Sequence, residues 1–180
     1  MKRIVLVYGL ISGVITGGLM LVTMPMFKSG ALDMKNGALI GYTGMVIALS
    51  LIFFGIKSHR DNQGGSITFW KGCQIGILIA LMASVFYALT WEYTFRNLGV
   101  EFLDKMMGGH YEEMKASGAT DADIANQKAM MVSYKESAVI RFGWSLIEIF
   151  PVGLVVTLIC AALLRNKNFL PATPQTTTPN

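Results

Sequence analysis

One carboxylate, Glu148, lies inside the last long apolar run of the chain, and its position suggests chemistry. The run 142–164 contains no other charged residue. A charged side chain in hydrocarbon costs about 2.5–3.5 kcal/mol on insertion scales, so we expect Glu148 to face other helices and to be paired or protonated. It follows Phe142 by six residues, which places it about 9 Å from the outer end of a helix that rises 1.5 Å per residue.

The neighbours of Glu148 leave two interpretations open. Pro151 has no N–H to donate, so it frees the carbonyl of Ile147, next to the acid. Arg141, two turns earlier, and Arg96, at the end of the preceding apolar run, are both candidates to approach the carboxylate. Glu148, Pro151 and Arg141 then form either a cation or proton site or an interhelical hydrogen-bonding contact without further function.

The pattern of reactive residues predicts neither an enzyme nor a metal or cofactor protein. No nucleophile–base pair, no paired acids and no cysteine–histidine spacing typical of zinc occurs. His59 and His110 are expected on opposite sides of a membrane. Cys73 and Cys160 are expected near the cytoplasmic side, which is reducing, so no disulfide is predicted. We therefore predict no catalytic residues.

The composition indicates an integral membrane protein. Of 180 residues, 53% are hydrophobic and only 14% are charged, and the mean hydropathy is +0.50, which is too apolar for an ordinary soluble domain. The net charge of +4 comes from basic residues that flank the apolar runs, as orientation signals do. No basic stripe interleaved with aromatics is present, so nucleic acid is not expected as a partner.

The predicted fold is all-α: a bundle of four transmembrane helices with an extracytoplasmic helical hairpin between helices three and four. Residues 1–167 form one membrane domain, and the Pro/Thr-rich tail 168–180 is expected to be disordered. Apolar length predicts four spans and one polar insert: 4–24, 39–56, 72–91 and 142–164, with the insert at 95–140.

Local signals predict where the helices begin and end. Pro25 closes the first span, and Ser66 is the N-cap of the third. Within the insert, Ser117-Gly118 breaks an amphipathic helix, and Thr120 with Asp123 forms a capping box for a second helix. The methionines of this hairpin, Met106-Met107 and Met130-Met131, are either packing residues or a metal or partner surface.

Small residues repeat every four positions in two spans. They form one ridge at Gly9, Gly13 and Gly17 and a second that begins with Gly72 and Gly76. Such ridges let helices approach closely in lipid, where packing drives association. We expect each ridge to pack against another span, within one chain or across a homo-oligomer.

The basic residues also predict the orientation. One side receives seven of them against the single acid Asp61: Lys2, Arg3, Lys57, Arg60, Lys71, Arg165 and Lys167. By the positive-inside rule that side is cytoplasmic, so both termini are inside and the hairpin is outside.

Several blocks of the chain together resemble a known family. They are the start Met-Lys-Arg-Ile-Val-Leu, Ile40-Gly-Tyr-Thr, Gly-Gly-Ser-Ile-Thr-Phe-Trp-Lys-Gly, Glu-Glu-Met-Lys-Ala-Ser-Gly-Ala-Thr, and Arg-Phe-Gly followed by Glu148-Ile-Phe-Pro-Val-Gly-Leu. This succession is similar to the uncharacterised bacterial four-helix membrane proteins of domain of unknown function 4199. The resemblance implies four spans in the bacterial inner membrane, and it brings no site residues with it.

Two functions remain open at this point. The first is a structural or accessory envelope protein in the lipid bilayer that binds another membrane protein, or a second copy, through its glycine ridges and outer hairpin. The second is a small oligomeric ion- or proton-coupled transporter that uses Glu148. Four spans are few for a lone transporter, which favours the first.

Overall fold

The computed structural model describes residues 1–170, without the side chains of residues 34, 35, 98, 99, 101, 102, 105 and 106. The described chain is built of helices, in the order α1 (Lys2–Lys28), α2 (Met34–Asp61), α3 (Phe69–Ala116), α4 (Asp121–Glu136) and α5 (Ala138–Leu164). The predicted all-α fold is therefore confirmed. Most of the tail expected to be disordered, and the side chain of Met106 in the hairpin, lie outside the described residues.

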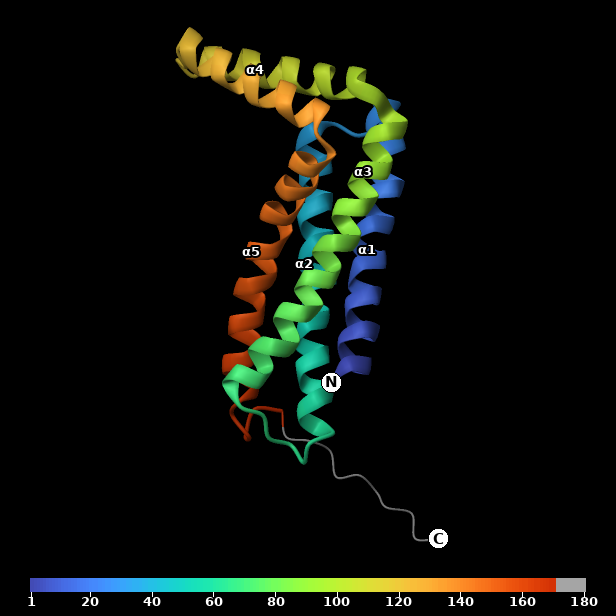
Figure 1. Cartoon of the computed structure of the whole chain (residues 1–180), viewed down its shortest axis with the longest axis vertical. Coiled ribbons are helices and arrows are strands. Elements are labelled where there is room, and N and C mark those ends of the chain that lie inside the picture. Colours follow the sequence, from blue (N-terminus) through green and yellow to red (C-terminus); the bar gives the residue numbers. More distant parts are fainter. Residues whose placement is uncertain (171–180) are drawn as a thin grey trace.

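Four helical segments are long and apolar enough to cross a membrane: Lys2–Lys28, Asn36–Asp61, Phe69–Asn97 and Ala138–Leu164. They stand side by side as a bundle, with the start of α1 and the end of α5 at the same end (Figure 1). Trp70 and Trp91 are 21 residues apart in α3, about 32 Å at 1.5 Å per residue. That distance matches the hydrocarbon thickness of a bilayer, about 30 Å.

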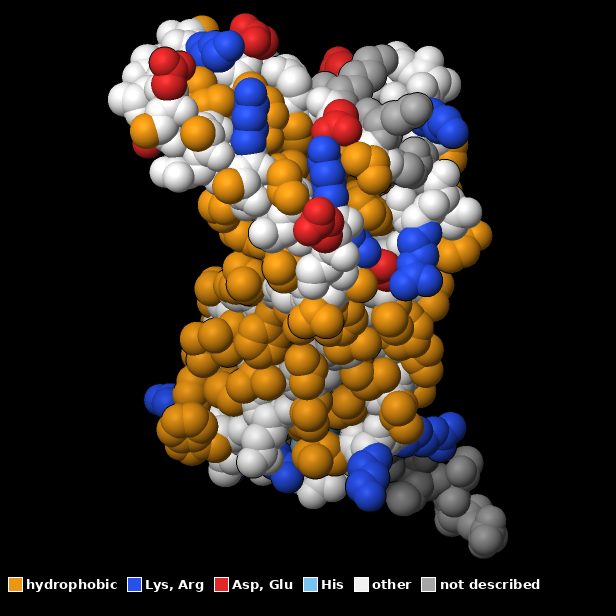
Figure 2. All heavy atoms as spheres, turned by 45° about the horizontal axis from the view of Figure 1, so that its top comes forward, with side chains coloured by type: hydrophobic (Ala, Val, Ile, Leu, Met, Phe, Trp, Pro, Cys, Tyr) orange, Lys and Arg blue, Asp and Glu red, His pale blue; other side chains and the backbone are white. Residues whose placement is uncertain are grey.

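The surface agrees with this assignment. On the face shown in Figure 2, an apolar belt covers the middle of the bundle, with basic side chains at the lower end and mixed charges at the upper end. Many large apolar side chains of the belt are exposed, among them Leu39, Val46, Val155 and Ile147. Such exposure is unfavourable in water and favourable in lipid.

The polar insert forms an arm (residues 98–136) at the end of the bundle opposite the start of α1. The outer part of α3 turns away from the bundle axis, and α4 returns beside it (Figure 1). The third span and the first helix of the insert are thus one continuous helix of 48 residues. The change from apolar to polar composition predicted two separate helices, but no proline between them breaks the hydrogen bonding.

The predicted end signals within the arm are confirmed. Ser117 is the C-cap of α3, and Gly118 has a φ of +88°, a conformation that glycine adopts without strain. The Thr120 hydroxyl accepts from the Asp123 N–H, and the Asp123 carboxylate accepts from the Thr120 N–H, as in a capping box. Lys135 of α4 also forms an ion pair with Asp104 of α3.

Two predicted helix ends are wrong. Pro25 does not close the first helix: it lies inside α1, and its carbonyl still accepts from the Ser29 N–H at 3.0 Å. The helix continues because proline removes only the hydrogen bond of its own nitrogen and has a helical φ. The N-cap of α3 is Thr68 rather than Ser66, because the Thr68 hydroxyl accepts from the Lys71 N–H.

The first glycine ridge packs against α3 within the same chain. A Cβ at Gly9, Gly13 or Gly17 would lie 2.9 Å or less from the facing side chain of α3, which is Met82, Phe86 and Thr90 respectively. Because both series increase together, α1 and α3 run parallel. The Ser12 hydroxyl, next to this ridge, donates to the carbonyl of Ala48 in α2 at 2.8 Å.

The second ridge packs against α5. Small residues face each other along this contact in antiparallel order: Gly72 with Ala161, Gly76 with Thr157, and Ala80 with Gly153. Each added Cβ would lie between 2.5 and 3.0 Å from its neighbour, so the two backbones approach about as closely as small residues permit.

The lower half of the bundle is a closely packed apolar core. Leu49, Ile52, Ile56, Ile75 and Ile79 of α2 and α3 are fully buried there. At the lower end Arg60 is also fully buried, and its guanidinium pairs with Asp61 and donates to the carbonyls of Phe169 and Leu170. The core therefore fills the half of the bundle that lies away from the arm.

Candidate functional site

Among the described residues Glu148 has one hydrogen-bond partner, and it is not a basic residue. The Tyr87 hydroxyl of α3 donates to Glu148 Oε2 across the helix contact, at 3.3 Å. None of the ion pairs among the described residues includes Glu148. The Glu148 side chain is not enclosed by the protein, and no described residue forms an ion pair with its carboxylate.

Neither arginine that was a candidate partner reaches Glu148, so that prediction is wrong. Both pair with Glu92 of α3 instead. Arg141 donates to both Glu92 oxygens, at 2.8 and 2.9 Å, and Arg96 donates to Oε1 at 2.9 Å. Arg141 lies seven residues before Glu148, about 10 Å along the helix, which explains the separation.

The Arg141 cluster, formed by Arg141, Glu92 and Arg96, joins the arm to the bundle. Arg141 is only 6% exposed, and its Nη1 donates to the carbonyls of Tyr134 and Lys135 at the end of α4, at 3.0 and 2.7 Å. Its guanidinium also lies over the Phe95 ring, 4.2 Å from the ring centre. One side chain thus holds α3, α4 and α5 together.

Sequence reasoning missed Glu92, although a local signal was present. Glu92 and Arg96 are four residues apart on one helix face, a spacing that favours an ion pair, and Glu92 directly follows Trp91 at the span end. The missing information was that Arg141 packs against the same turn.

Two cavities meet at Glu148. The inner cavity, about 260 Å³, lies between α1, α2, α3 and α5 and has mainly apolar walls, including Met20, Phe27 and Met45. The outer cavity, about 800 Å³, lies beneath the arm and is lined by residues of α3, α4 and α5 together with Tyr42 of α2. Both cavities share four wall residues: Tyr42, Tyr87, Trp91 and Glu148.

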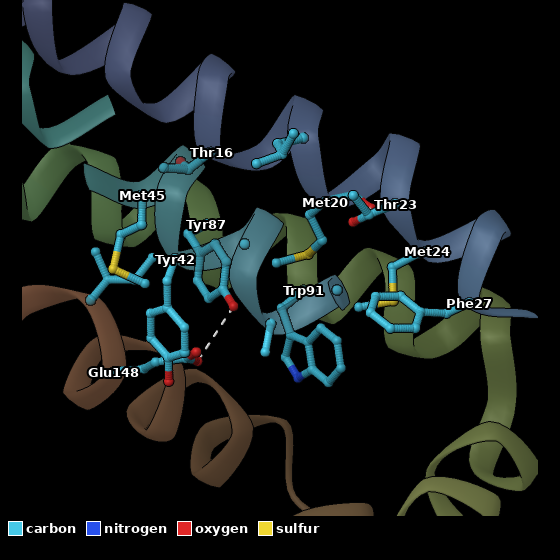
Figure 3. A pocket seen from close by; sticks show the side chains of 15 residues that line it. Thr16, Met20, Thr23, Met24, Phe27, Tyr42, Met45, Tyr87, Trp91 and Glu148 are labelled. Carbon is cyan, nitrogen blue, oxygen red and sulfur yellow. Dashed lines mark hydrogen bonds between the residues drawn. The ribbon is translucent and has the colours of Figure 1, made fainter. Parts of the chain in front are cut away.

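The shared wall combines aromatic rings and polar ends from three helices. Tyr42 of α2 and Tyr87 of α3 lie beside Glu148 of α5, and Trp91 follows along α3 (Figure 3). Tyr87 and Trp91 share one face of α3 because they are four residues apart. This arrangement gives an acceptor and flat apolar surfaces at one place.

The other predicted site residue, Pro151, is not part of either described cavity wall. It lies inside α5 with an exposed side chain, about one turn beyond Glu148. Arg141 is also outside both walls. The structure therefore brings Glu148 together with aromatic residues, keeps Arg141 away from it, and leaves Pro151 one turn away outside the cavity walls.

Above Glu148, Tyr134 of α4 connects the arm to the cavity. Its hydroxyl accepts a hydrogen bond from the Trp91 indole N–H, and both side chains line the outer cavity. Burial raises the pKa of Tyr134 above its ordinary value of 10, so the phenol stays protonated and uncharged at neutral pH. Phe95, Leu103 and Met107 pack beside it as a small apolar cluster.

Comparison with known proteins identifies a family but no activity. Neither the curated proteins nor the solved structures gave a match. A family model described as protein of unknown function (DUF4199) matches residues 8–166. This range contains the arm, Glu92, Glu148 and all four apolar helical segments apart from residues 2–7. The chain belongs to this family of proteins of unknown function.

Proposed function

We propose that the protein is a multi-pass protein of the bacterial inner (cytoplasmic) membrane that binds an amphiphilic molecule in the two cavities at Glu148. In this proposal it is an accessory envelope protein and not an enzyme. The observation that carries the proposal is the meeting of an apolar and a more polar cavity at one carboxylate. The outer cavity lies within the range of about 300–1,000 Å³ typical of ligand pockets, and the inner one slightly below it.

The depth of the site supports an amphiphilic ligand. Tyr87, which contacts Glu148, precedes Trp91 by four residues, about 6 Å along the helix. Trp91 is at the expected level of the membrane interface, where tryptophan gathers. A molecule at this depth has its polar group near the interface and its apolar part in hydrocarbon.

The glycine ridges do not support binding of another membrane protein. Gly9, Gly13, Gly17, Gly72 and Gly76 contact α3 or α5 of their own chain, so they are not free to pack against another protein. The arm and the cavity beneath it remain as the surface through which an accessory protein of this kind would bind.

The closed lower half argues against a transporter that operates in this conformation. Transport needs access to the bound ion from both sides of the membrane. On the side away from the arm, Leu49, Ile52 and Ile79 are fully buried, and neither described cavity extends to them. We therefore propose binding rather than ion-coupled transport.

The proposed orientation places both termini in the cytoplasm and the arm outside. It is supported by the basic residues, since the start of α1, the end of α2, the start of α3 and the end of α5 share one end of the bundle (Figure 1). The positive-inside rule assigns that end to the cytoplasm.

Tryptophan fluorescence in lipid nanodiscs tests the binding proposal. The chain has three tryptophans. Trp91 and Trp144 line the outer cavity, whereas Trp70 lies at the other end of the apolar part of α3. Dodecanol and dodecylamine that carry bromine in the alkyl chain should quench the tryptophan fluorescence of a Trp70→Phe protein, and the quenching should saturate as their concentration rises. A protein that retains only Trp70 should show linear quenching from the bulk lipid. Linear quenching in both proteins, with both compounds, would refute the proposal.

A further inference from the structure

The cavities at Glu148 have an unbalanced charge. Their described walls include two carboxylates, Glu148 and Glu113, and one histidine, His110, but no lysine or arginine. The nearest arginines described above, Arg141 and Arg96, already pair with Glu92. A carboxylate in the outer hydrocarbon region is costly without a counter-ion, so a bound cation would stabilise it and an anion would be repelled.

The aromatic residues at the junction also favour a cation. Tyr42, Tyr87 and Trp91 present ring surfaces around Glu148, and aromatic faces attract ammonium groups by their quadrupoles. The Tyr87 oxygen donates its hydrogen to Glu148 and keeps its lone pairs as acceptors. An ammonium with several N–H groups can therefore donate to Glu148 and Tyr87 together.

A metal ion fits this place poorly. No group of three or more His, Cys, Asp or Glu residues suited to a metal occurs in the described part of the chain, and hard divalent cations require six or more oxygen ligands. A small hydrophilic amine would not fill the inner cavity, because the walls of that cavity are mainly apolar. The combination of an apolar cavity and one carboxylate fits an apolar tail attached to a cationic group.

We propose that the ligand is a cationic amphiphile whose ammonium group pairs with Glu148 between Tyr42, Tyr87 and Trp91 and whose apolar tail occupies the inner cavity. This inference rests on the proposed function, of which it specifies the ligand. The outer cavity is the route by which the amphiphile reaches Glu148 from beneath the arm.

The brominated amphiphiles test the charge requirement directly. Dodecylamine carries one positive charge at pH 7, and dodecanol has the same chain without it. The charge-assisted hydrogen bonds to Glu148 should make the amine bind to the Trp70→Phe protein about tenfold or more tightly than the alcohol. The quenching of the protein that retains only Trp70 measures how much of each compound has partitioned into the lipid, and each affinity is corrected for that amount.

Variants assign the preference to Glu148. Glu148→Gln keeps the size and hydrogen-bonding capacity of the side chain but removes its charge, so it should remove the advantage of the amine over dodecanol. Glu112→Gln is the matched control, because Glu112 is exposed on the arm and outside both cavity walls; the advantage should persist there.

The outcomes separate the two proposals. Equal binding of amine and alcohol, or an amine preference that persists in Glu148→Gln, would overturn the cationic ligand and leave amphiphile binding intact. Absence of saturable binding for both compounds would overturn the proposed function itself. Tighter binding of a brominated phosphatidylethanolamine than of the amine would also overturn this inference, since it would identify a zwitterionic membrane lipid as the ligand.

Discussion

At the scale of single residues, Arg141 is the side chain on which the geometry of the outer end depends most. It is buried, donates hydrogen bonds to Glu92 and to two carbonyls of α4, and lies over the ring of Phe95. Arginine suits this role because its planar guanidinium donates five hydrogen bonds in fixed directions, which lysine cannot do. The arm and the roof of the outer cavity are therefore positioned through one residue.

We predict that Arg141→Ala destabilises the protein by about 2–3 kcal/mol. Removing one partner of a buried pair costs about 3–5 kcal/mol. We expect a loss at or below the lower end of this range, because Glu92 still pairs with Arg96 in the variant. Thermal unfolding in mild detergent measures the effect. Arg96→Ala is the control: Arg96 is 72% exposed, so it should cost less than about 1 kcal/mol. Equal losses in the two variants would contradict the assigned role of Arg141.

At the scale of elements, the helix contacts depend on small residues that allow close approach. Gly13 and Gly18 are both inside α1, but an added Cβ would lie 2.7 Å from Phe86 at position 13 and would meet nothing within 4 Å at position 18. The two positions therefore share a helix and differ in their surroundings.

We predict that Gly13→Leu lowers the stability by about 2–3 kcal/mol, the upper part of the range for overpacked sites. Gly18→Leu should be neutral or slightly stabilising, because leucine is the better helix former and the side chain would face open space. Melting temperatures of both variants in the same detergent give the comparison. A Gly13→Leu protein as stable as Gly18→Leu would mean that α1 does not contact α3 through this ridge.

The capping box of α4 makes the arm sensitive to acid. The Thr120 hydroxyl and backbone N–H bond to the Asp123 carboxylate and hold the pKa of Asp123 below its ordinary value of 3.8. A lowered pKa in the folded state means that Asp123 contributes stability above pH 3.8, and the contribution is lost as the pH falls through 3.8 and then through the folded-state pKa.

We predict that the stability difference between the natural protein and Asp123→Asn disappears in this acid range. Melting curves from pH 6 down to pH 2.5 measure it. Asp121→Asn is the control, because Asp121 is exposed in the same first turn and is not the capping residue. A difference that stays constant with pH would contradict the role of Asp123.

At the scale of the whole molecule, the bundle has one basic end and one end that carries the arm. Cysteine labelling tests which end is outside. Ser117→Cys, at the tip of the arm, should react with a membrane-impermeant reagent in whole spheroplasts, whereas Asn62→Cys, in the loop after α2, should react only after the cells are opened. The native Cys73 and Cys160 are buried and should add little background. The reverse pattern would overturn the proposed orientation.

The sequence by itself determined the features that depend on neighbouring residues. Apolar length predicted the four spanning helices, and Ser117-Gly118 with Thr120 and Asp123 predicted the turn and cap within the hairpin. These properties follow from hydropathy and local hydrogen bonding, which need no knowledge of distant residues. The ridge Gly9, Gly13 and Gly17 likewise indicated a close helix contact, because its period of four is visible in the chain.

Only the tertiary structure decided the partners of the charged residues and the existence of the cavities. Glu148 meets Tyr87 rather than Arg141, and Arg141 meets Glu92, because each helix is rotated about its axis to bring its small-residue ridge against a neighbour. That rotation sets which side chains share a level and a face across α3 and α5. It depends on the joint packing of several helices, and the spacing of residues along one helix does not contain it.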